Sequence, residues 1–248
     1  MNTKIIDLLN TIPKVDLTLD CIRDGTMGSI QADDPENPES ICIHLADFWY
    51  LGGDPQTEWA NEIILKIPTY DLIMSAATGW VEEIARVHGD RLQPYTRFSF
   101  SAVSLSKDAL KSLFDTSPHK ENILPIDSVN LDILLALTDS GFEYRQFGAP
   151  ENFLDKGFGY IYKNEQTILG MAYTALVAQR GIEVSIWVAE RQRQRGIATA
   201  LASRLILECF DRGLEPHWDA ANGESVKLAK KLRYTFTRAY DAYYIEKR

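Results

Sequence analysis

The segment RQRQRGIATA, residues 191–200, has residue types that suit an anion-binding site. If a strand ends before it and a helix opens at Gly196 and Ala198, several backbone N–H groups stay unpaired at the helix N-terminus. These donors and the positive end of the helix dipole attract anions. A hydrogen bond to a charged group contributes roughly 1.5–3 kcal/mol, so a few amides would hold a pyrophosphate. The arginines would add only screened, partly exposed charge. We call residues 189–196 the glycine turn.

Other interpretations of the glycine turn make different demands on the sequence. A Walker A loop needs GxxxxGK[ST] and a dinucleotide-binding fingerprint needs GxGxxG, and neither pattern occurs in the chain. The formal net charge of −9 argues against a nucleic-acid-binding surface, which needs many basic contacts to phosphates. An ordinary connection with its arginines in solvent remains the alternative to a phosphate cradle.

The elements on either side of the glycine turn follow from periodicity. Before it, Ile182, Val184, Ile186 and Val188 alternate with more polar residues, which predicts a strand with Glu183 on the face opposite the apolar row. After it, apolar residues recur every four positions, which predicts a helix from Gly196 to Asp211 with the stripe Ile197, Leu201, Leu205 and Cys209.

The rest of the second half reads as short strands and helices. Strands are predicted at 157–164, 167–176, 215–221 and 234–247. A short helix at 131–137 is predicted to end at the DSG of residues 139–141. A longer helix is predicted at 222–232, where Asn222 or Ser225 is able to cap its first turn. The order is an antiparallel meander, then the glycine turn, helix, strand, helix and strand.

The first half gives mixed signals. Residues 41–55 predict one or two short strands that end at paired glycines and a proline, and residues 79–89 predict a helix. Residues 97–105 alternate like a strand. The segment 115–128, DTSPHKENILPIDS, combines prolines, turn formers and charge, which favours a linker. We therefore expect an α/β (α+β) protein with an N-terminal α/β domain at 1–121 that contributes to the substrate cleft, and a second domain at 122–248.

Composition narrows the protein class. No apolar run approaches the length of a membrane span, and the N-terminus is too short and too charged for a signal peptide, so we expect a cytoplasmic protein without a membrane partner. The cysteines, Cys21, Cys42 and Cys209, are odd in number and lie far apart. This spacing predicts neither a disulfide framework nor a metal site, and favours small buried side chains.

Residues Arg193–Ala198, RQRGIA, match the [QR]-x-x-G-x-[GA] signature of the GNAT superfamily of N-acetyltransferases. The strand EVSIWV, the helix TALASRLILECF and the segment WDAANGESVKLAKKLRYTF resemble the elements around that signature. This resemblance covers roughly residues 122–248 and implies a GNAT-like fold with a mixed, mostly antiparallel central sheet flanked by helices. More loosely, FWYLGGDP and GLEPHWDAANGESVKLAKKL resemble a larger branch with an extra N-terminal region, which includes zwittermicin A resistance-type acetyltransferases.

The resemblance implies acetyl-CoA as the cosubstrate and a set of residues that bind it. Backbone amides of the signature bind the pyrophosphate in the superfamily, and an asparagine beside the coenzyme A arm matches Asn222. The implied binding residues are Val188, Arg193, Gln194, Arg195, Gly196, Ile197, Ala198, Thr199, Asn222 and Ser225. Arg191, Arg193 or Arg195 would contact cofactor phosphates, and single changes of these arginines to alanine are expected to weaken binding less than Gly196→Val.

The resemblance also implies catalytic roles. In the superfamily a backbone N–H on the strand before the signature polarises the thioester carbonyl, and Val188 is the nearest match. Glu183 is the candidate general base, although a solvent-facing glutamate on a half-buried strand is the alternative. The tyrosine that many members use as the general acid is replaced by Ala229. Tyr234 and the tyrosines of the last strand are possible substitutes whose expected role is packing.

The expected function is therefore an acetyl-CoA-dependent N-acetyltransferase that moves an acetyl group directly to a primary amine. The alternative is a non-catalytic acyl-CoA-binding regulatory module, which Ala229 favours. The expected partner is a small-molecule or peptide amine, not nucleic acid, and the assembly that we consider is a homodimer. Neither the acceptor nor the oligomeric state follows from the sequence.

Overall fold

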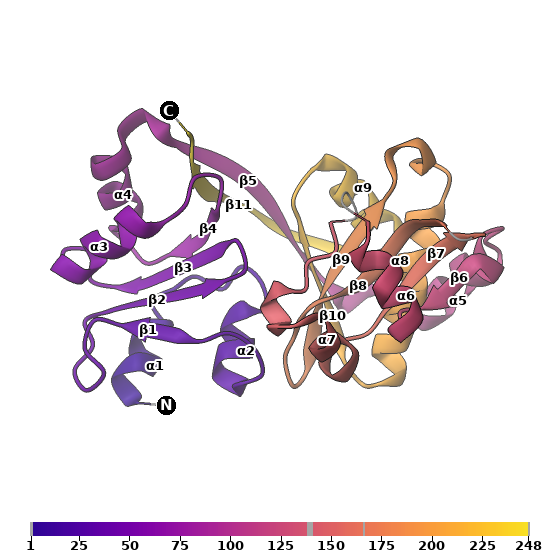
Figure 1. Cartoon of the computed structure of the whole chain (residues 1–248), viewed down its shortest axis with the longest axis horizontal. Coiled ribbons are helices and arrows are strands. Elements are labelled where there is room, and N and C mark those ends of the chain that lie inside the picture. Colours follow the sequence, from indigo (N-terminus) through magenta and orange to yellow (C-terminus); the bar gives the residue numbers. More distant parts are fainter. Residues whose placement is uncertain (1, 138–140, 166, 248) are drawn as a thin grey trace. The chain divides into compact units, whose positions relative to one another are not determined.

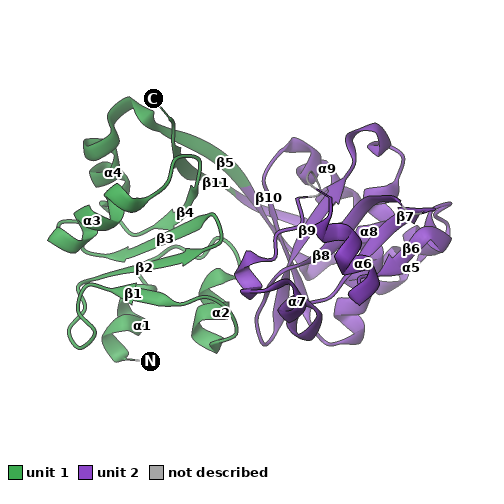
Figure 2. Ribbon diagram, viewed as in Figure 1, with its two compact units in different colours: residues 1–97, 239–248 green, residues 98–238 purple. Residues whose placement is uncertain are grey.

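The computed structural model describes residues 2–137, 141–165 and 167–247. The chain divides into two compact units (Figure 2): unit 1 comprises residues 1–97 and 239–248, and unit 2 comprises residues 98–238. The division therefore falls between residues 97 and 98 and not near residue 122, and the last ten residues return to unit 1. The expected end of a helix at residues 139–140 lies outside the described residues.

Unit 1 is a sheet with helices on both faces. Its strands follow the order β1-β2-β3-β4-β11-β5. The pairs β1–β2, β2–β3 and β4–β11 are antiparallel, and β3 pairs parallel to β4. The elements are α1 (Thr3–Leu9), α2 (Thr18–Asp24), β1 (Ile30–Ala32), β2 (Ser40–Leu45), β3 (Phe48–Gly53), α3 (Glu58–Lys66), β4 (Leu72–Ala76), α4 (Trp80–His88), η1 (Gly89–Arg91) and the first part of β5 (Leu92–Ser101).

Alternate residues of the unit 1 strands supply two separate cores. Ile41 and Ile43 of β2 pack in one cluster with Leu9 of α1 and Leu19 of α2. Cys42 packs in the other with residues of α3 and α4, including Trp80. A strand that is buried on both faces is apolar at nearly every position, and β2 is buried at all positions but one.

Unit 2 contains the remaining elements. They are η2 (Ala102–Ser104), α5 (Lys107–Asp115), η3 (Lys120–Asn122), β6 (Ile123–Pro125), α6 (Ser128–Leu135), η4 (Arg145–Phe147), α7 (Pro150–Lys156), β7 (Gly159–Asn164), β8 (Thr167–Val177), β9 (Gly181–Val188), η5 (Glu190–Gln192), α8 (Ile197–Asp211), β10 (Glu215–Ala220), α9 (Gly223–Lys231) and β11 (Thr235–Ile245), whose end belongs to unit 1. The strand order is β5-β10-β9-β8-β7-β6, in which β9 and β10 pair parallel and the other neighbours pair antiparallel.

Helix α8 packs against strands β7, β8 and β9 (Figure 1). Its predicted apolar stripe is confirmed, because Ile197, Leu201, Leu205 and Cys209 are all buried. On β8, Ala172 packs in the cluster with Ile197 and Leu201, whereas its neighbour Tyr173 contacts the ring of Phe153 on α7. The sheet of unit 2 is thus covered on both faces, and the predicted mixed, mostly antiparallel α/β fold is confirmed.

The predicted linker at 115–128 is instead part of the unit 2 fold. Leu124 and Pro125 of β6 pair with β7, and helix α5 contributes Leu110 to a core that includes Ala202 and Ile206 of α8. Prolines and charges occur in edge strands as well as in linkers, so composition alone could not distinguish the two. In the part of the chain that the structure describes, no helix has both the length and the apolar character needed to cross a membrane.

Candidate active site

The parallel strands β9 and β10 separate partway along their length. They pair from Gly181 opposite Glu215 to Glu183 opposite His217. Beyond that point β10 pairs with β5 through Trp218–Ala220, while β9 continues to Val188. A cavity of about 600 Å³ is lined by residues of both strands beyond the point of separation, and by the glycine turn, the start of α8 and one side of α9.

The glycine turn places the N-terminus of α8 at this cavity. Gly196 is the N-cap residue with φ of +89°, and within the described residues no side chain caps the helix. The first intrahelical bond is donated by Ala200 N to the Gly196 carbonyl at 3.1 Å. The amides of Ile197, Ala198 and Thr199 come before that bond, and all three residues line the cavity. The predicted uncapped helix N-terminus therefore faces a space that is able to hold an anion.

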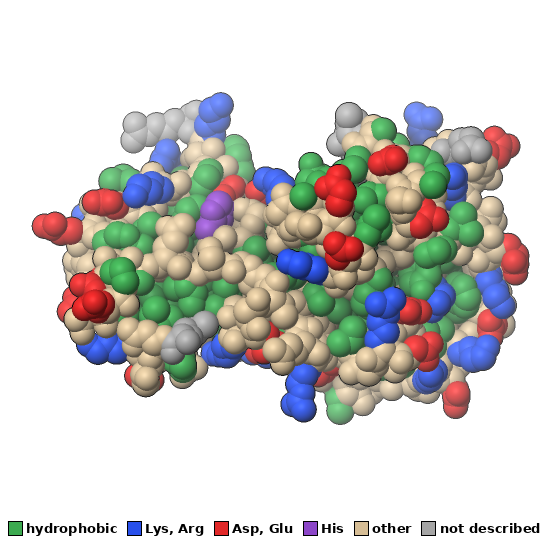
Figure 3. Space-filling view, turned by 60° about the horizontal axis from the view of Figure 1, so that its bottom comes forward, with side chains coloured by type: hydrophobic (Ala, Val, Ile, Leu, Met, Phe, Trp, Pro, Cys, Tyr) green, Lys and Arg blue, Asp and Glu red, His purple; other side chains and the backbone are tan. Residues whose placement is uncertain are grey.

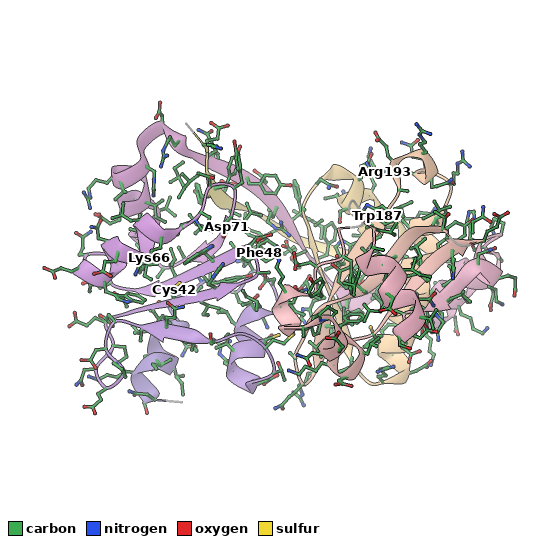
Figure 4. All side chains as sticks on the ribbon, viewed as in Figure 1. Cys42, Phe48, Lys66, Asp71, Trp187 and Arg193 are labelled. Carbon is green, nitrogen blue, oxygen red and sulfur yellow. The ribbon has the colours of Figure 1, made fainter. Side chains whose placement is uncertain are left out.

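The arginines of the turn differ in their surroundings. Arg193 lines the cavity and donates from Nε to the Val188 carbonyl at 3.2 Å, which ties the turn to the end of β9. Figure 4 labels Arg193 together with Trp187, which lies on β9 and also lines the cavity. Arg195 is not among the lining residues, and its carbonyl accepts a hydrogen bond from His119. Gln194 lines the cavity and has a positive φ of 61°.

The backbone of Val188 points its N–H away from β8. Ala189 N donates to the Leu169 carbonyl at 2.9 Å, and consecutive residues of a strand direct their N–H groups to opposite edges. The Val188 carbonyl, which accepts from Arg193, likewise points away from β8. The N–H of Val188 is therefore directed to the edge from which β10 has separated, where Val188 lines the cavity.

The opposite side of the cavity is formed by Trp218 and the start of α9. Asn222 is the N-cap of α9, and its Oδ1 accepts from the amides of Glu224 and Ser225 at 3.1 and 2.9 Å, as predicted for a capping residue. The Asn222 amide nitrogen is not used by this cap. Trp218 donates from Nε1 to Ser225 Oγ at 3.1 Å, so the indole and the first turn of α9 hold each other in place.

Glu183 occupies the last paired position before the two strands separate. It is only 8% exposed, so the alternative of a solvent-facing glutamate is wrong. Val184 and Ile186 pack toward α8, so Glu183 lies on the opposite face of the sheet, as predicted. It is not among the residues that line the cavity. The structure thus brings together all predicted binding residues except Arg195, and leaves Glu183 beside the cavity and not in it.

The positions considered for a general acid are occupied by packing residues. Ala229 is fully buried in the core formed with Trp218 and Leu232. Tyr234 is buried as well, and its hydroxyl donates to the Pro216 carbonyl at 3.1 Å. Burial raises the pKa of the Tyr234 hydroxyl well above its usual value, which makes it a poor acid near neutral pH. The expected packing role of Tyr234 is confirmed.

Several lining residues were not expected from the sequence. Lys227 and Lys231 lie one helical turn apart on α9, and both line the cavity, whereas the neighbouring Lys230 does not. Their spacing of four residues was the available signal, since residues at that spacing share a helix face. These lysines add positive charge beside a helix N-terminus in a chain of net charge −9. On the face shown in Figure 3, acidic and basic side chains are interspersed, which fits a local and not an extended basic site.

Comparison with known proteins places these features in a family. A family model described as GNAT acetyltransferase matches residues 7–243, so the likeness extends over both units and is not confined to residues 122–248. The chain is similar to an uncharacterized N-acetyltransferase of Bacillus subtilis (strain 168), YdfB, with 24% identity over 236 residues that cover 90% of this chain and 88% of the relative.

Solved structures agree with this assignment. A GCN5-related N-acetyltransferase-like protein from Streptococcus suis 89/1591 has 28% identity, a TM-score of 0.84 and coverage of 98% of both chains. A GCN5-related N-acetyltransferase from Kribbella flavida shares the fold at 11% identity, with a TM-score of 0.55 and coverage of 85% of this chain and 88% of its own. With a family model that spans nearly its whole length, the chain belongs to the GNAT acetyltransferase family and is an acyl-CoA-dependent N-acetyltransferase.

Proposed function

We propose that the protein transfers an acetyl group from acetyl-CoA directly to a primary amine of its acceptor. The observation that carries this proposal is the cavity at the separation of β9 and β10, because one cavity holds both the uncapped N-terminus of α8 and the end of β9. Direct transfer is consistent with this arrangement, since a thioester and an amine held together react as if in one molecule.

The residues present fit coenzyme A. The volume of about 600 Å³ is within the range of small-molecule sites. The amides of Ile197, Ala198 and Thr199 would donate to the pyrophosphate, and a Cβ built on Gly196 meets no atom within 4 Å, so this end of the cavity is open. The amide nitrogen of Asn222, which the cap does not use, would donate to the pantetheine arm. Lys227 and Lys231 would stand near the remaining phosphate charge.

The end of β9 would activate the carbonyl. Acetyl-CoA, when bound, supplies the acetyl thioester. The N–H of Val188 would donate to the thioester oxygen and stabilise the negative charge that develops there. The transfer forms a bond between the acceptor nitrogen and the acetyl carbon, and it breaks the bond from that carbon to sulfur. No protein acid is assigned to the departing thiolate, because a coenzyme A thiolate is stable enough to leave without one.

Glu183 is proposed as the general base. It is buried at the point where β9 and β10 separate, and it lies outside the cavity lining, so it would take the amine proton through water. By accepting that proton, the base leaves the nitrogen neutral, so that its lone pair forms the bond to the acetyl carbon. The resemblance to zwittermicin A resistance-type acetyltransferases, a role of unit 1 in acceptor recognition, a cytoplasmic location and a homodimer stay predictions.

The test combines binding and turnover. Coenzyme A should raise the melting temperature of the purified protein, because a ligand at 100 times its Kd stabilises the native state by about 2.7 kcal/mol. Release of free thiol from acetyl-CoA is then followed with a panel of primary amines, and mass spectrometry identifies the acetylated product. A tertiary-amine analogue of each hit is the matched control. Absence of thermal stabilisation, or thiol release that equals the amine-free rate with every amine, would contradict the proposal.

A further inference from the structure

His119 contacts the glycine turn from a distant part of the chain. It precedes η3, in the segment between α5 and β6, and its ring meets the Tyr162 ring on β7 edge to face with centroids 5.1 Å apart. Asn122, at the end of the same segment, donates from Nδ2 to the Lys163 carbonyl at 3.1 Å. The ring contact and this hydrogen bond thus hold the segment against β7.

The imidazole also contacts Arg195, the residue before Gly196. His119 Nε2 lies 2.8 Å from the Arg195 carbonyl oxygen. A carbonyl only accepts hydrogen bonds, so Nε2 carries the proton, as it does both in the Nε2–H tautomer and in the imidazolium. The contact joins positions 76 residues apart in the sequence, and it lies within unit 2.

This bond acts on a peptide plane that belongs to the anion-binding turn. The Arg195 carbonyl and the Gly196 N–H lie in one planar, trans peptide unit, so fixing the carbonyl fixes the direction of the N–H. The turn needs such support, because Gln194 beside this peptide has a positive φ of 61° and is not a glycine. A non-glycine residue in that conformation costs about 1–3 kcal/mol and persists when its surroundings determine it.

We propose that His119 is a positioning residue for the coenzyme A site. Its Nε2–H bond holds the Arg195–Gly196 peptide in the orientation in which the turn and the start of α8 present their amides to the pyrophosphate. His119 is not one of the cavity-lining residues, so it acts through the turn and does not touch the ligand. This inference rests on the proposed function of the glycine turn.

Two variants of His119 separate the hydrogen bond from the ring contact. His119→Phe keeps an aromatic ring against Tyr162 and removes the donor. His119→Gln loses the ring and keeps an N–H donor at the reach of Nε2. Lys120→Ala is the control, because it removes a neighbouring, partly exposed side chain whose Nζ binds Asp115 at 2.8 Å and leaves the imidazole in place.

The measurement is the Kd of coenzyme A by isothermal titration calorimetry at constant salt, with melting temperatures recorded for all variants. We expect His119→Phe to weaken binding about three- to tenfold, and His119→Gln and Lys120→Ala to stay within about twofold of the wild type. Wild-type affinity in His119→Phe, or equal weakening in His119→Phe and His119→Gln, would overturn this inference alone. A wild-type protein that does not bind coenzyme A would overturn the proposed function together with it.

Discussion

Gly196 offers the sharpest test of a site built from backbone amides. Its φ is +89°, where an L-residue costs about 1–2 kcal/mol, and a β-branched residue is a clear outlier. A Cβ at this position meets no atom within 4 Å, so the β-carbon of Gly196→Val has room. The valine would strain the turn, and because Gly196 lines the cavity its side chain is expected to compete with an anion at the α8 amides.

The expected sizes follow from these two effects. Strain of about 1–2 kcal/mol lowers the melting temperature by roughly 2–8 °C for a protein of this size. Loss of one amide bond to a phosphate removes about 1.5–3 kcal/mol of binding, which corresponds to roughly 10- to 150-fold in Kd. Arg191→Ala and Arg195→Ala remove charges from exposed side chains, worth about 0–1 kcal/mol each, and are expected to weaken binding less than Gly196→Val.

Gly213→Ala is the matched control for strain. Gly213 follows α8 at its other end, has φ of +69°, and a Cβ built on it also meets no atom within 4 Å, but it does not line the cavity. Calorimetric titration with coenzyme A and thermal melting should show a stability loss in both glycine variants and a binding loss only in Gly196→Val. The hypothesis that backbone amides bind the pyrophosphate fails if the arginine variants weaken binding more than Gly196→Val does. It also fails if Gly213→Ala weakens binding as much as Gly196→Val.

Three further predictions concern residues beside the cavity and in the cores. Glu183→Gln should lower kcat at neutral pH while the Kd of coenzyme A stays unchanged; equal turnover across pH would remove Glu183 as the base. Lys227→Ala should weaken coenzyme A binding and reduce its salt dependence, whereas Lys230→Ala, on the same helix outside the cavity, should do neither in the same titrations. Burial raises the pKa of the Cys42 and Cys209 thiols to about 12 from 9.0. Their protonated forms therefore contribute stability that is complete below pH 9 and is lost as the pH rises toward 12. Alkylation at pH 8.5 should accordingly require unfolding, and rapid labelling of the native protein would contradict this.

Some elements escaped prediction for physical reasons. Helices α1, α2 and α7 have seven residues each, which is too short for a clear helical period. Strands β2 and β3 are buried on both faces, so their apolar runs show no alternation that would fix their limits. The edge strand β6 has only three residues, one of them proline, and it forms because β7 offers a partner.

The sequence by itself determined the local parts of the site. The alternation before Val188, the four-residue spacing after Gly196 and the capping ability of Asn222 each act over a few residues, and each is found in the structure. A positive φ at Gly196 is likewise a local requirement that glycine meets without strain. These features were sufficient to predict a strand, a turn and a helix that present amides to an anion.

Only the tertiary structure decided what surrounds those amides. β9 and β10 pair only as far as Glu183 and His217, and β10 then pairs on its other edge with β5, a strand more than a hundred residues earlier in the chain. Packing buried Ala229 and Tyr234 in a core and left Glu183 beside the cavity. The same packing brought His119 to the Arg195 carbonyl. Such contacts depend on which distant surfaces bury each other, and no periodicity within a short segment records that choice.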